Sequence, residues 1–210
     1  MATQISPRKA PRQARALVTV DAILEAAARI IASGGLAAYN TNAVAERAGV
    51  SIGSLYQYFG SKDALMAALI ERQQAQQLAS VATAISAFPA DASLESIVRA
   101  LVRAAMQHHH DDPLLASAID HEELRLPLDD RIAPYLEQSG ALVVALLERF
   151  VEETGPVDHA TAARTLPALV RGVVDAWANL YPPQLDRAED EAVRAVMGYL
   201  LGREQGNCAS

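Results

Sequence analysis

The chain has 210 residues and a mass of 22.4 kDa, which is enough to bury a substantial core in one large or two small domains. It is rich in alanine and only 5% aromatic, a composition that favours helices over sheets. Its longest apolar run, residues 141–147, is far shorter than the roughly 18 to 20 residues that span a bilayer, and the N-terminus lacks the apolar segment of a secretory signal. We therefore expect an all-α protein without a membrane span. Cys208 is the only cysteine, so an intrachain disulfide is impossible and a cytoplasmic protein is expected.

The net charge of -7 conceals an asymmetry along the chain. Residues 1–72 contain eight Lys and Arg against five Asp and Glu, whereas residues 73–210 contain ten against twenty. Binding to a polyanion needs clustered cations, so only the N-terminal part is suited to approach nucleic acid. Residues 1–15 contain four cations, no acid and two prolines, a composition that predicts a flexible basic arm.

The hydrophobic spacing predicts about nine helices. The first spans roughly residues 19–33 and stops at a pair of glycines, and two short helices follow on either side of Gly49. Asn40 or Thr41 caps the first of these two, and the second starts near Ser51. A long helix from Lys62 to about residue 88 comes next. Five further amphipathic segments are expected at roughly 93–110, 113–124, 128–153, 158–180 and 186–203.

The two short helices around Gly49 have the spacing of a helix-turn-helix. Ala45 is small where the helices would cross, Gly49 can adopt the positive φ of the turn, and Val50 can lock the second helix onto the first. Leu55 and Phe59 are expected in the core, which leaves the outer face of the second helix free to enter a major groove. The residues expected to reach base edges are Ser51, Ile52, Gly53, Ser54, Gln57 and, depending on helix rotation, Tyr56.

The stretch TNAVAERAGVSIGSLYQYFGSKDALMAALI, residues 41–70, resembles the DNA-binding domain of the TetR family of bacterial transcription regulators. The distinctive part is Leu55 and Tyr56, then Phe59, then Ser61 and Lys62 at the start of the next helix; Gly60 stands where many relatives have Pro. The resemblance extends over roughly residues 15–72. It implies a basic arm (1–15), a helix-turn-helix DNA-binding domain (16–72), and a helical effector-binding and dimerisation domain (73–210) joined to it by the long helix.

The resemblance also implies DNA contacts position by position. Thr41 and Asn42 match residues that touch a phosphate or a base edge, Tyr56 and Tyr58 match aromatic side chains at the DNA backbone, and Lys62 matches a lysine that pairs with phosphate. A lysine beside a helix N-terminus also suits phosphate on physical grounds. Tyr58 can equally be a half-buried core residue. The candidate DNA-binding residues are Thr41, Asn42, Ser51, Ile52, Gly53, Ser54, Tyr56, Gln57, Tyr58 and Lys62.

The acidic C-terminal part is expected to dimerise and to bind an effector. Residues 166–180 and 192–202 are apolar around much of their circumference, and Trp177 is a plausible anchor. The expected dimer interface consists of Leu169, Gly172, Val173, Ala176, Trp177, Leu180, Val193, Val196, Met197 and Leu200. The expected effector pocket consists of Leu101, Ala105, Met106, His109, Leu115, Ile119, Leu146 and Phe150, and it suits a small, largely apolar effector. Each of these residues can also be ordinary core, because apolar stripes at helical spacing are usually packing.

The run HHHDD at residues 108–112 invites a metal interpretation. Successive residues of a helix point about 100° apart, so three consecutive histidines cannot share one ion. We therefore expect a polar helix end before Pro113, with no metal and no cofactor. Because HExxH, Walker and dinucleotide-binding motifs are also missing from the sequence, an enzyme is not expected.

These features predict a sequence-specific transcription regulator, a repressor rather than an activator. It would bind a palindromic operator in double-stranded DNA as a homodimer and be released by a small-molecule effector. The alternative is a helical adaptor that binds protein and not DNA. Salt separates the two, because the affinity of a regulator for DNA falls steeply as salt rises, whereas an adaptor ignores DNA altogether.

Overall fold

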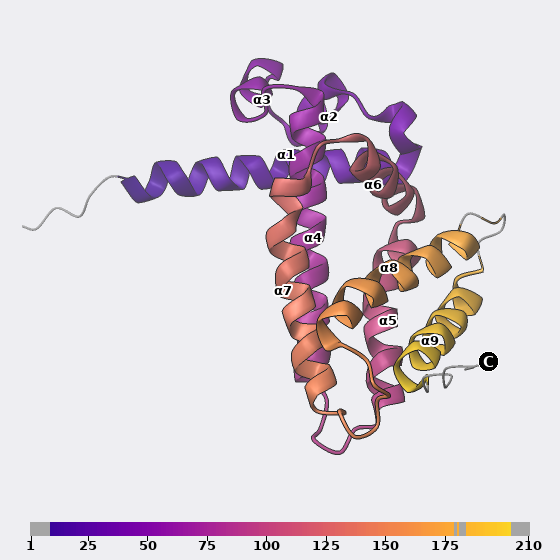
Figure 1. Cartoon of the computed structure of the whole chain (residues 1–210). Helices are drawn as coiled ribbons and strands as arrows, with labels where there is room; N and C mark the ends of the chain where they lie inside the picture. Colours follow the sequence, from indigo (N-terminus) through magenta and orange to yellow (C-terminus); the bar gives the residue numbers. More distant parts are fainter. Residues whose placement is uncertain (1–8, 179, 181–183, 203–210) are drawn as a thin grey trace, which may run out of the picture. The chain divides into compact units, whose positions relative to one another are not determined.

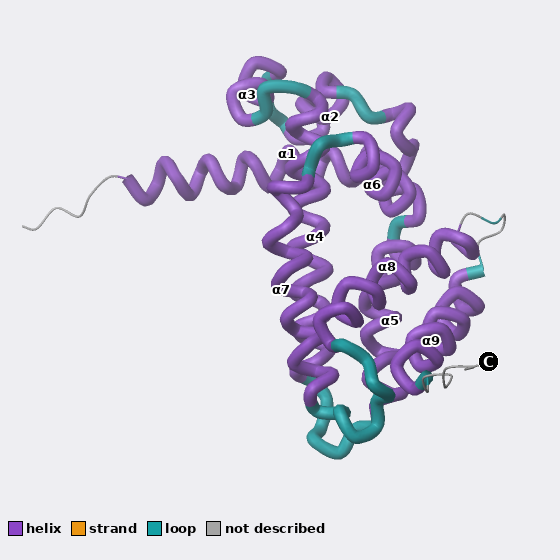
Figure 2. The backbone as a smooth tube through the Cα atoms, in the orientation of Figure 1, coloured by secondary structure: helices purple, strands orange, loops and turns teal. Residues whose placement is uncertain are grey.

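The computed structural model describes residues 9–178, 180 and 184–202. Within these residues the chain forms nine helices and no strand, which confirms the all-α prediction (Figure 1; Figure 2). None of the helices in this part of the chain is long and apolar enough to cross a membrane. The helices are α1 (Lys9–Ala38), α2 (Thr41–Ala48), α3 (Ile52–Tyr58), α4 (Lys62–Ser86), α5 (Leu94–Asp111), α6 (Pro113–Arg125), α7 (Asp129–Glu148), α8 (His159–Ala178) and α9 (Leu185–Leu201).

Helix α1 starts earlier than expected. It starts at Lys9, so residues 9–15 are helical where the composition predicted a flexible arm; residues 1–8 of that arm lie outside the described residues. Position 11 falls in the first turn, whose amides have no intrahelical acceptor, so a proline is compatible with the helix there. At the other end the range of α1 runs to Ala38 because it joins two helices across a kink at Gly35, which has a φ of 64°. The first of these helices therefore ends at the glycine pair, as expected, and a short second one follows.

The chain divides into two compact units. Unit 1 consists of residues 1–71 and 112–127, and unit 2 of residues 72–111 and 128–210. The first segment of unit 1 ends at residue 71, and the DNA-binding domain was expected to end at residue 72. The difference from the sequence-based division is α6, which was expected in the C-terminal domain and instead packs against α1 in unit 1. The chain thus leaves unit 1 after residue 71 and comes back to it at residues 112–127. The order of the helices along the sequence does not reveal this.

Unit 1 has a core drawn from all of its helices. Ile23 and Ile31 of α1 are fully buried, as are Val44 of α2, Leu55 of α3 and Leu65 of α4. Helix α6 adds Ile119, which is 3% exposed. Burying side chains of this size stabilises the unit by about 1.5–3 kcal/mol each. Helices α2 and α3 are too short to be stable alone, so this shared core is what holds them in place.

Unit 2 is built from α5, α7, α8, α9 and residues 72–86 of α4. Helix α8 packs against α7 and α9, and α5 packs against α9. Buried residues of the core include Leu94, Ile97, Val102, Leu147, Ala162, Val174, Ala192, Val193, Val196 and Leu200. On the surface of the unit, Arg103 of α5 donates two hydrogen bonds to Glu189 of α9, at 2.7 and 3.1 Å. This pair joins two helices that are far apart in the sequence.

Candidate nucleic-acid interface

The turn between α2 and α3 has the geometry that its sequence predicts. The Asn40 side-chain oxygen accepts a hydrogen bond from the Ala43 amide at 2.9 Å and so caps α2. Gly49 ends α2 in the left-handed region, with φ 67° and ψ 31°, which confirms the expected positive φ. The Val50 amide then donates to the Ala45 carbonyl at 3.0 Å, a C-terminal cap that turns the chain toward α3. The angle between α2 and α3 is thus set by hydrogen bonds local to the turn.

Helix α3 is anchored on one side and open on the other. The Ser51 hydroxyl accepts a hydrogen bond from the Ser54 amide at 3.0 Å and caps the helix. Leu55 is fully buried and Phe59 is 7% exposed, as expected of core residues. Tyr56 is 47% exposed, and Tyr58, whose position was open between core and surface, is 40% exposed. A rigid short helix with an exposed outer face has the form that a major groove admits.

The ten candidate DNA-binding residues lie on the surface of unit 1 around α2, α3 and the start of α4. Thr41 and Ser54 are half-buried, and the exposed ones are Asn42, Ser51, Ile52, Gly53, Tyr56, Gln57, Tyr58 and Lys62. Thr41 of α2 and Tyr56 of α3 share a hydrogen bond, with 3.2 Å between their hydroxyl oxygens. This bond joins two of the candidate DNA-binding side chains.

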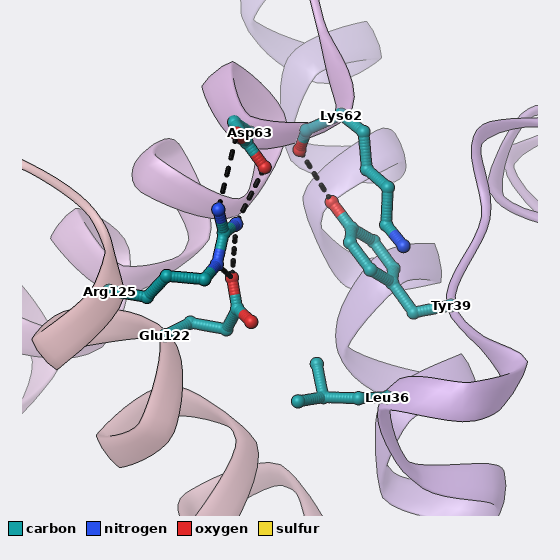
Figure 3. A pocket seen from close by; sticks show the side chains of 6 residues that line it. All are labelled: Leu36, Tyr39, Lys62, Asp63, Glu122 and Arg125. Atoms are coloured by element: carbon teal, nitrogen blue, oxygen red, sulfur yellow. Dashed lines mark hydrogen bonds and ion pairs between the residues drawn. The ribbon is translucent and has the colours of Figure 1, made fainter.

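The first turn of α4 is held by a buried tyrosine that sequence reasoning missed. The Tyr39 hydroxyl donates a hydrogen bond to the Lys62 carbonyl at 3.0 Å, and the Lys62 ammonium lies 4.8 Å from the centre of the Tyr39 ring (Figure 3). Tyr39 is 2% exposed, and burial raises the pKa of its hydroxyl, as do the charges of Glu122 and Asp63. The hydroxyl therefore remains protonated and able to donate. Ser61 completes this helix start, because its hydroxyl accepts a hydrogen bond from the Ala64 amide at 3.0 Å.

A pocket of about 280 Å³ opens beside this helix start, lined by Leu36, Tyr39, Lys62, Asp63, Glu122 and Arg125. Figure 3 shows the Arg125 side chain reaching the carboxylates of both Asp63 and Glu122. One guanidinium nitrogen lies 2.6 Å from an Asp63 oxygen and 2.6 Å from a Glu122 oxygen. The hydrogen bond from Arg125 holds the pKa of Asp63 below its ordinary value. No sequence signal links Arg125 to Asp63, because 62 residues separate them.

The candidate effector residues are divided between the two units. Leu115 and Ile119 belong to α6 in unit 1, and the other six belong to unit 2. Within unit 2, Met106, Leu146 and Phe150 are members of the buried core, Leu101 packs against it, Ala105 is half-buried and His109 is 9% exposed. Helix α5 ends at Asp111, directly after the histidine run, as expected of a polar helix end; the side chains of His108 and His110 lie outside the described residues.

The candidate dimer residues fall into three groups by burial. Val193, Val196 and Leu200 are at most 4% exposed and pack inside unit 2, so they face its own core. The half-buried residues packed against that core are Leu169, Val173, Trp177 and Met197. The exposed ones are Gly172, Ala176 and Leu180. Only the second and third groups present surface to a partner.

The arrangement in unit 1 defines a helix-turn-helix protein of the DNA-binding class. Two family models match the chain: one described as bacterial regulatory proteins of the tetR family, over residues 23–69, and one described as the tetracyclin repressor-like C-terminal domain, over residues 93–200. The chain belongs to the TetR family of bacterial transcription regulators. Regulators of this family bind DNA through the helix-turn-helix.

Individual relatives agree with this assignment. An uncharacterized HTH-type transcriptional regulator of Mycobacterium tuberculosis is 29% identical over 183 residues, which cover 86% of this chain and 84% of the relative. The HTH-type transcriptional repressor KstR of Rhodococcus jostii is 29% identical over 157 residues, 74% of this chain and 67% of the relative. A solved TetR transcriptional regulator from Rhodococcus sp. RHA1 shares the fold, with a TM-score of 0.66, 24% identity, and coverage of 90% of this chain and 98% of that one.

Proposed function

We propose that this chain represses transcription by binding an inverted repeat in DNA as a homodimer, and that a small, largely apolar effector releases it. The main observation in support is the fixed position of α3, whose inner side is buried at Leu55 and whose outer side is exposed. A helix that keeps its orientation can present several side chains to base edges without an ordering cost.

The proposed contacts separate into two kinds. Gln57 and the N-terminal residues of α3 (Ser51, Ile52, Gly53, Ser54) are proposed to meet base edges, because they surround the exposed start of the helix. Thr41, Asn42, Tyr56, Tyr58 and Lys62 are proposed to meet the DNA backbone. Backbone contacts fix position, and base contacts give sequence preference.

DNA binding is tested by titrating the purified protein with fragments of the DNA upstream of its own gene, at salt concentrations from about 50 to 200 mM. We expect saturable binding to one fragment, a footprint with twofold symmetry, and an affinity that falls steeply with salt. A monomeric sample that binds no fragment at low salt would instead support the helical adaptor.

Dimerisation is proposed through α8 and α9. Helix α3 has seven residues, which is too few to select a site alone, whereas two copies related by a twofold axis read half-sites about 34–36 Å apart. The proposed contact surface combines exposed Gly172, Ala176 and Leu180 with half-buried Trp177. The small residues allow a partner helix to approach closely, and the aromatic side chain supplies buried area.

Gly172→Arg tests this surface, because a Cβ at Gly172 meets no atom within 4 Å of it and the protomer should tolerate the change. We expect a monomer by light scattering with an unchanged melting temperature. Gln138→Arg, at an exposed position of α7, is the matched control and should remain dimeric. A dimeric Gly172→Arg protein would place the interface elsewhere.

The effector is proposed to enter the apolar interior of unit 2, among the candidate residues of α5, of α7 and of the turn after α7 (Leu101, Ala105, Met106, His109, Leu146, Phe150). The other two candidates, Leu115 and Ile119, belong to unit 1 and are not part of this proposed site. Helix α4 supplies residues to both units, so a change in the packing of unit 2 can alter the position of the DNA-binding helices. Apolar compounds that raise the melting temperature are to be added to the DNA titration. A compound that binds tightly and leaves the DNA affinity unchanged would contradict release by an effector.

A further inference from the structure

Lys62 lies in a pocket that also contains acidic side chains. This lysine is the proposed phosphate contact of α4, and its neighbours along the lining of the same pocket include two carboxylates, Asp63 and Glu122. The hydrogen bond from Arg125 lowers the pKa of Asp63 most, and the positive charge of Lys62 lowers it further. A carboxylate at such a place competes with DNA phosphate for the lysine, because both are anions that accept charge-assisted hydrogen bonds.

Arg125 forms hydrogen bonds with both carboxylates, Asp63 and Glu122. Its guanidinium donates to both oxygens of Asp63, at 2.6 and 3.4 Å, and twice to one oxygen of Glu122, at 2.6 and 2.9 Å. The Glu122 side chain is 11% exposed, so its charge would be costly without this partner. The planar guanidinium matches two carboxylates at once, which a lysine ammonium does less well.

Lys62 is left available as a result. Within the residues that the structure describes, it makes no ion pair, and its ammonium lies over the Tyr39 ring at 4.8 Å. A contact with an aromatic ring orients a cation without neutralising it. The Tyr39 hydroxyl also donates a hydrogen bond to the Lys62 carbonyl. The backbone of the lysine is therefore held in place, while its ammonium has no anionic partner in the described part of the chain.

We propose that Arg125 of α6 is a positioning residue for DNA binding, which keeps the Lys62 ammonium free for phosphate by occupying the carboxylates of Asp63 and Glu122. The inference rests on the proposed DNA contact of Lys62. It assigns part of the DNA-binding function to α6, which lies outside the helix-turn-helix. Without Arg125, the Asp63 carboxylate pairs with Lys62 and withholds one cation from the DNA.

The test uses a charge-neutral double variant. Arg125→Gln alone would leave the buried Glu122 carboxylate without its partner and endanger the fold, so Glu122→Gln is combined with it and the net charge of the protein is unchanged. Of Asp63, Glu122 and Arg125, only the Asp63 carboxylate then keeps its charge. The control is Arg103→Gln with Glu189→Gln, which removes an Arg–Glu pair with two hydrogen bonds from unit 2 and also leaves the net charge unchanged.

Affinity is measured by fluorescence anisotropy with a labelled duplex of mixed sequence, because a phosphate contact does not depend on sequence. We expect the Glu122→Gln/Arg125→Gln protein to bind about tenfold more weakly than the wild type. The slope of log affinity against log salt should become shallower by about one, as for Lys62→Ala, because one fewer counterion is released. The control pair should leave both quantities unchanged.

Asp63→Asn added to the double variant should restore most of the lost affinity and the original salt slope, since the competing carboxylate is gone. In the wild-type chain, where Arg125 already occupies that carboxylate, the same change should alter affinity by less than about twofold. A role of Arg125 in folding alone predicts no such rescue.

Two results would overturn the inference: wild-type affinity in the double variant, or weak binding that Asp63→Asn does not restore. Both are distinct from a failure of the proposed function, in which the wild-type protein itself binds no duplex at low salt.

Discussion

The two units present their candidate functional residues in opposite environments. In unit 1 the proposed DNA contacts are mostly polar and exposed, and the helices that hold them are fixed by side-chain caps and by buried anchors such as Leu55. In unit 2 Met106, Leu146 and Phe150 are buried apolar side chains within a continuous core. A surface for a polyanion must differ from the interior in composition, whereas a site for an apolar ligand is made of the same residues as the interior.

The largest effects are expected from truncating a buried side chain in each unit. Leu55→Ala in α3 and Met106→Ala in α5 should each lower the free energy of unfolding by about 2–5 kcal/mol, because both side chains are at most 1% exposed. Chemical denaturation measures the loss. A Met106→Ala protein that keeps its stability would show that this side chain borders space for a ligand, and the contrast between the units would then be stronger.

An intermediate effect is expected at the exposed face of unit 1. Gln57→Ala should change preference among DNA sequences by about 1–3 kcal/mol at one base position, because a lost base contact affects only that position. Lys62→Ala should weaken binding to all sequences alike and make the salt slope shallower by about one. Competition binding with a panel of single-base variants distinguishes them. Uniform loss in both proteins would show that Gln57 does not face the bases.

The smallest effect is expected from the titration of Asp63. Its pKa is lowered by the hydrogen bond from Arg125, so the stabilisation is present above the ordinary pKa of 3.8 and is lost as the pH falls through the lowered value. Because Asp63 is exposed, solvent screens the pair and the effect is slight. Melting temperatures measured from about pH 5 down to about pH 2 should show a shallower decline for Asp63→Asn than for the wild type. Parallel curves would mean that the pair contributes nothing to stability.

Local features of unit 1 were predictable because neighbouring residues determine them. The positive φ of Gly49 follows from its place at the end of a two-turn helix. A cap at Asn40 or Thr41 follows from these two polar residues before the apolar run, and the structure places it at Asn40. In unit 2, the end of α5 before Pro113 was predictable for the same reason. Rotation about a helix axis was harder to predict: Val193, Val196 and Leu200 were expected at a partner's surface but lie inside unit 2.

The sequence by itself determined the all-α fold, most helix boundaries and the family, since these depend on propensity, spacing and motifs within a few tens of residues. Only the tertiary structure decided that α6 joins unit 1, that Tyr39 holds the carbonyl of Lys62, and that Arg125 pairs with Asp63. Each of these depends on side chains that are separated in sequence by 23 residues or more. Contacts of that kind are set by how amphipathic faces pack together, and the spacing of residues along one helix does not encode which other helix will cover it.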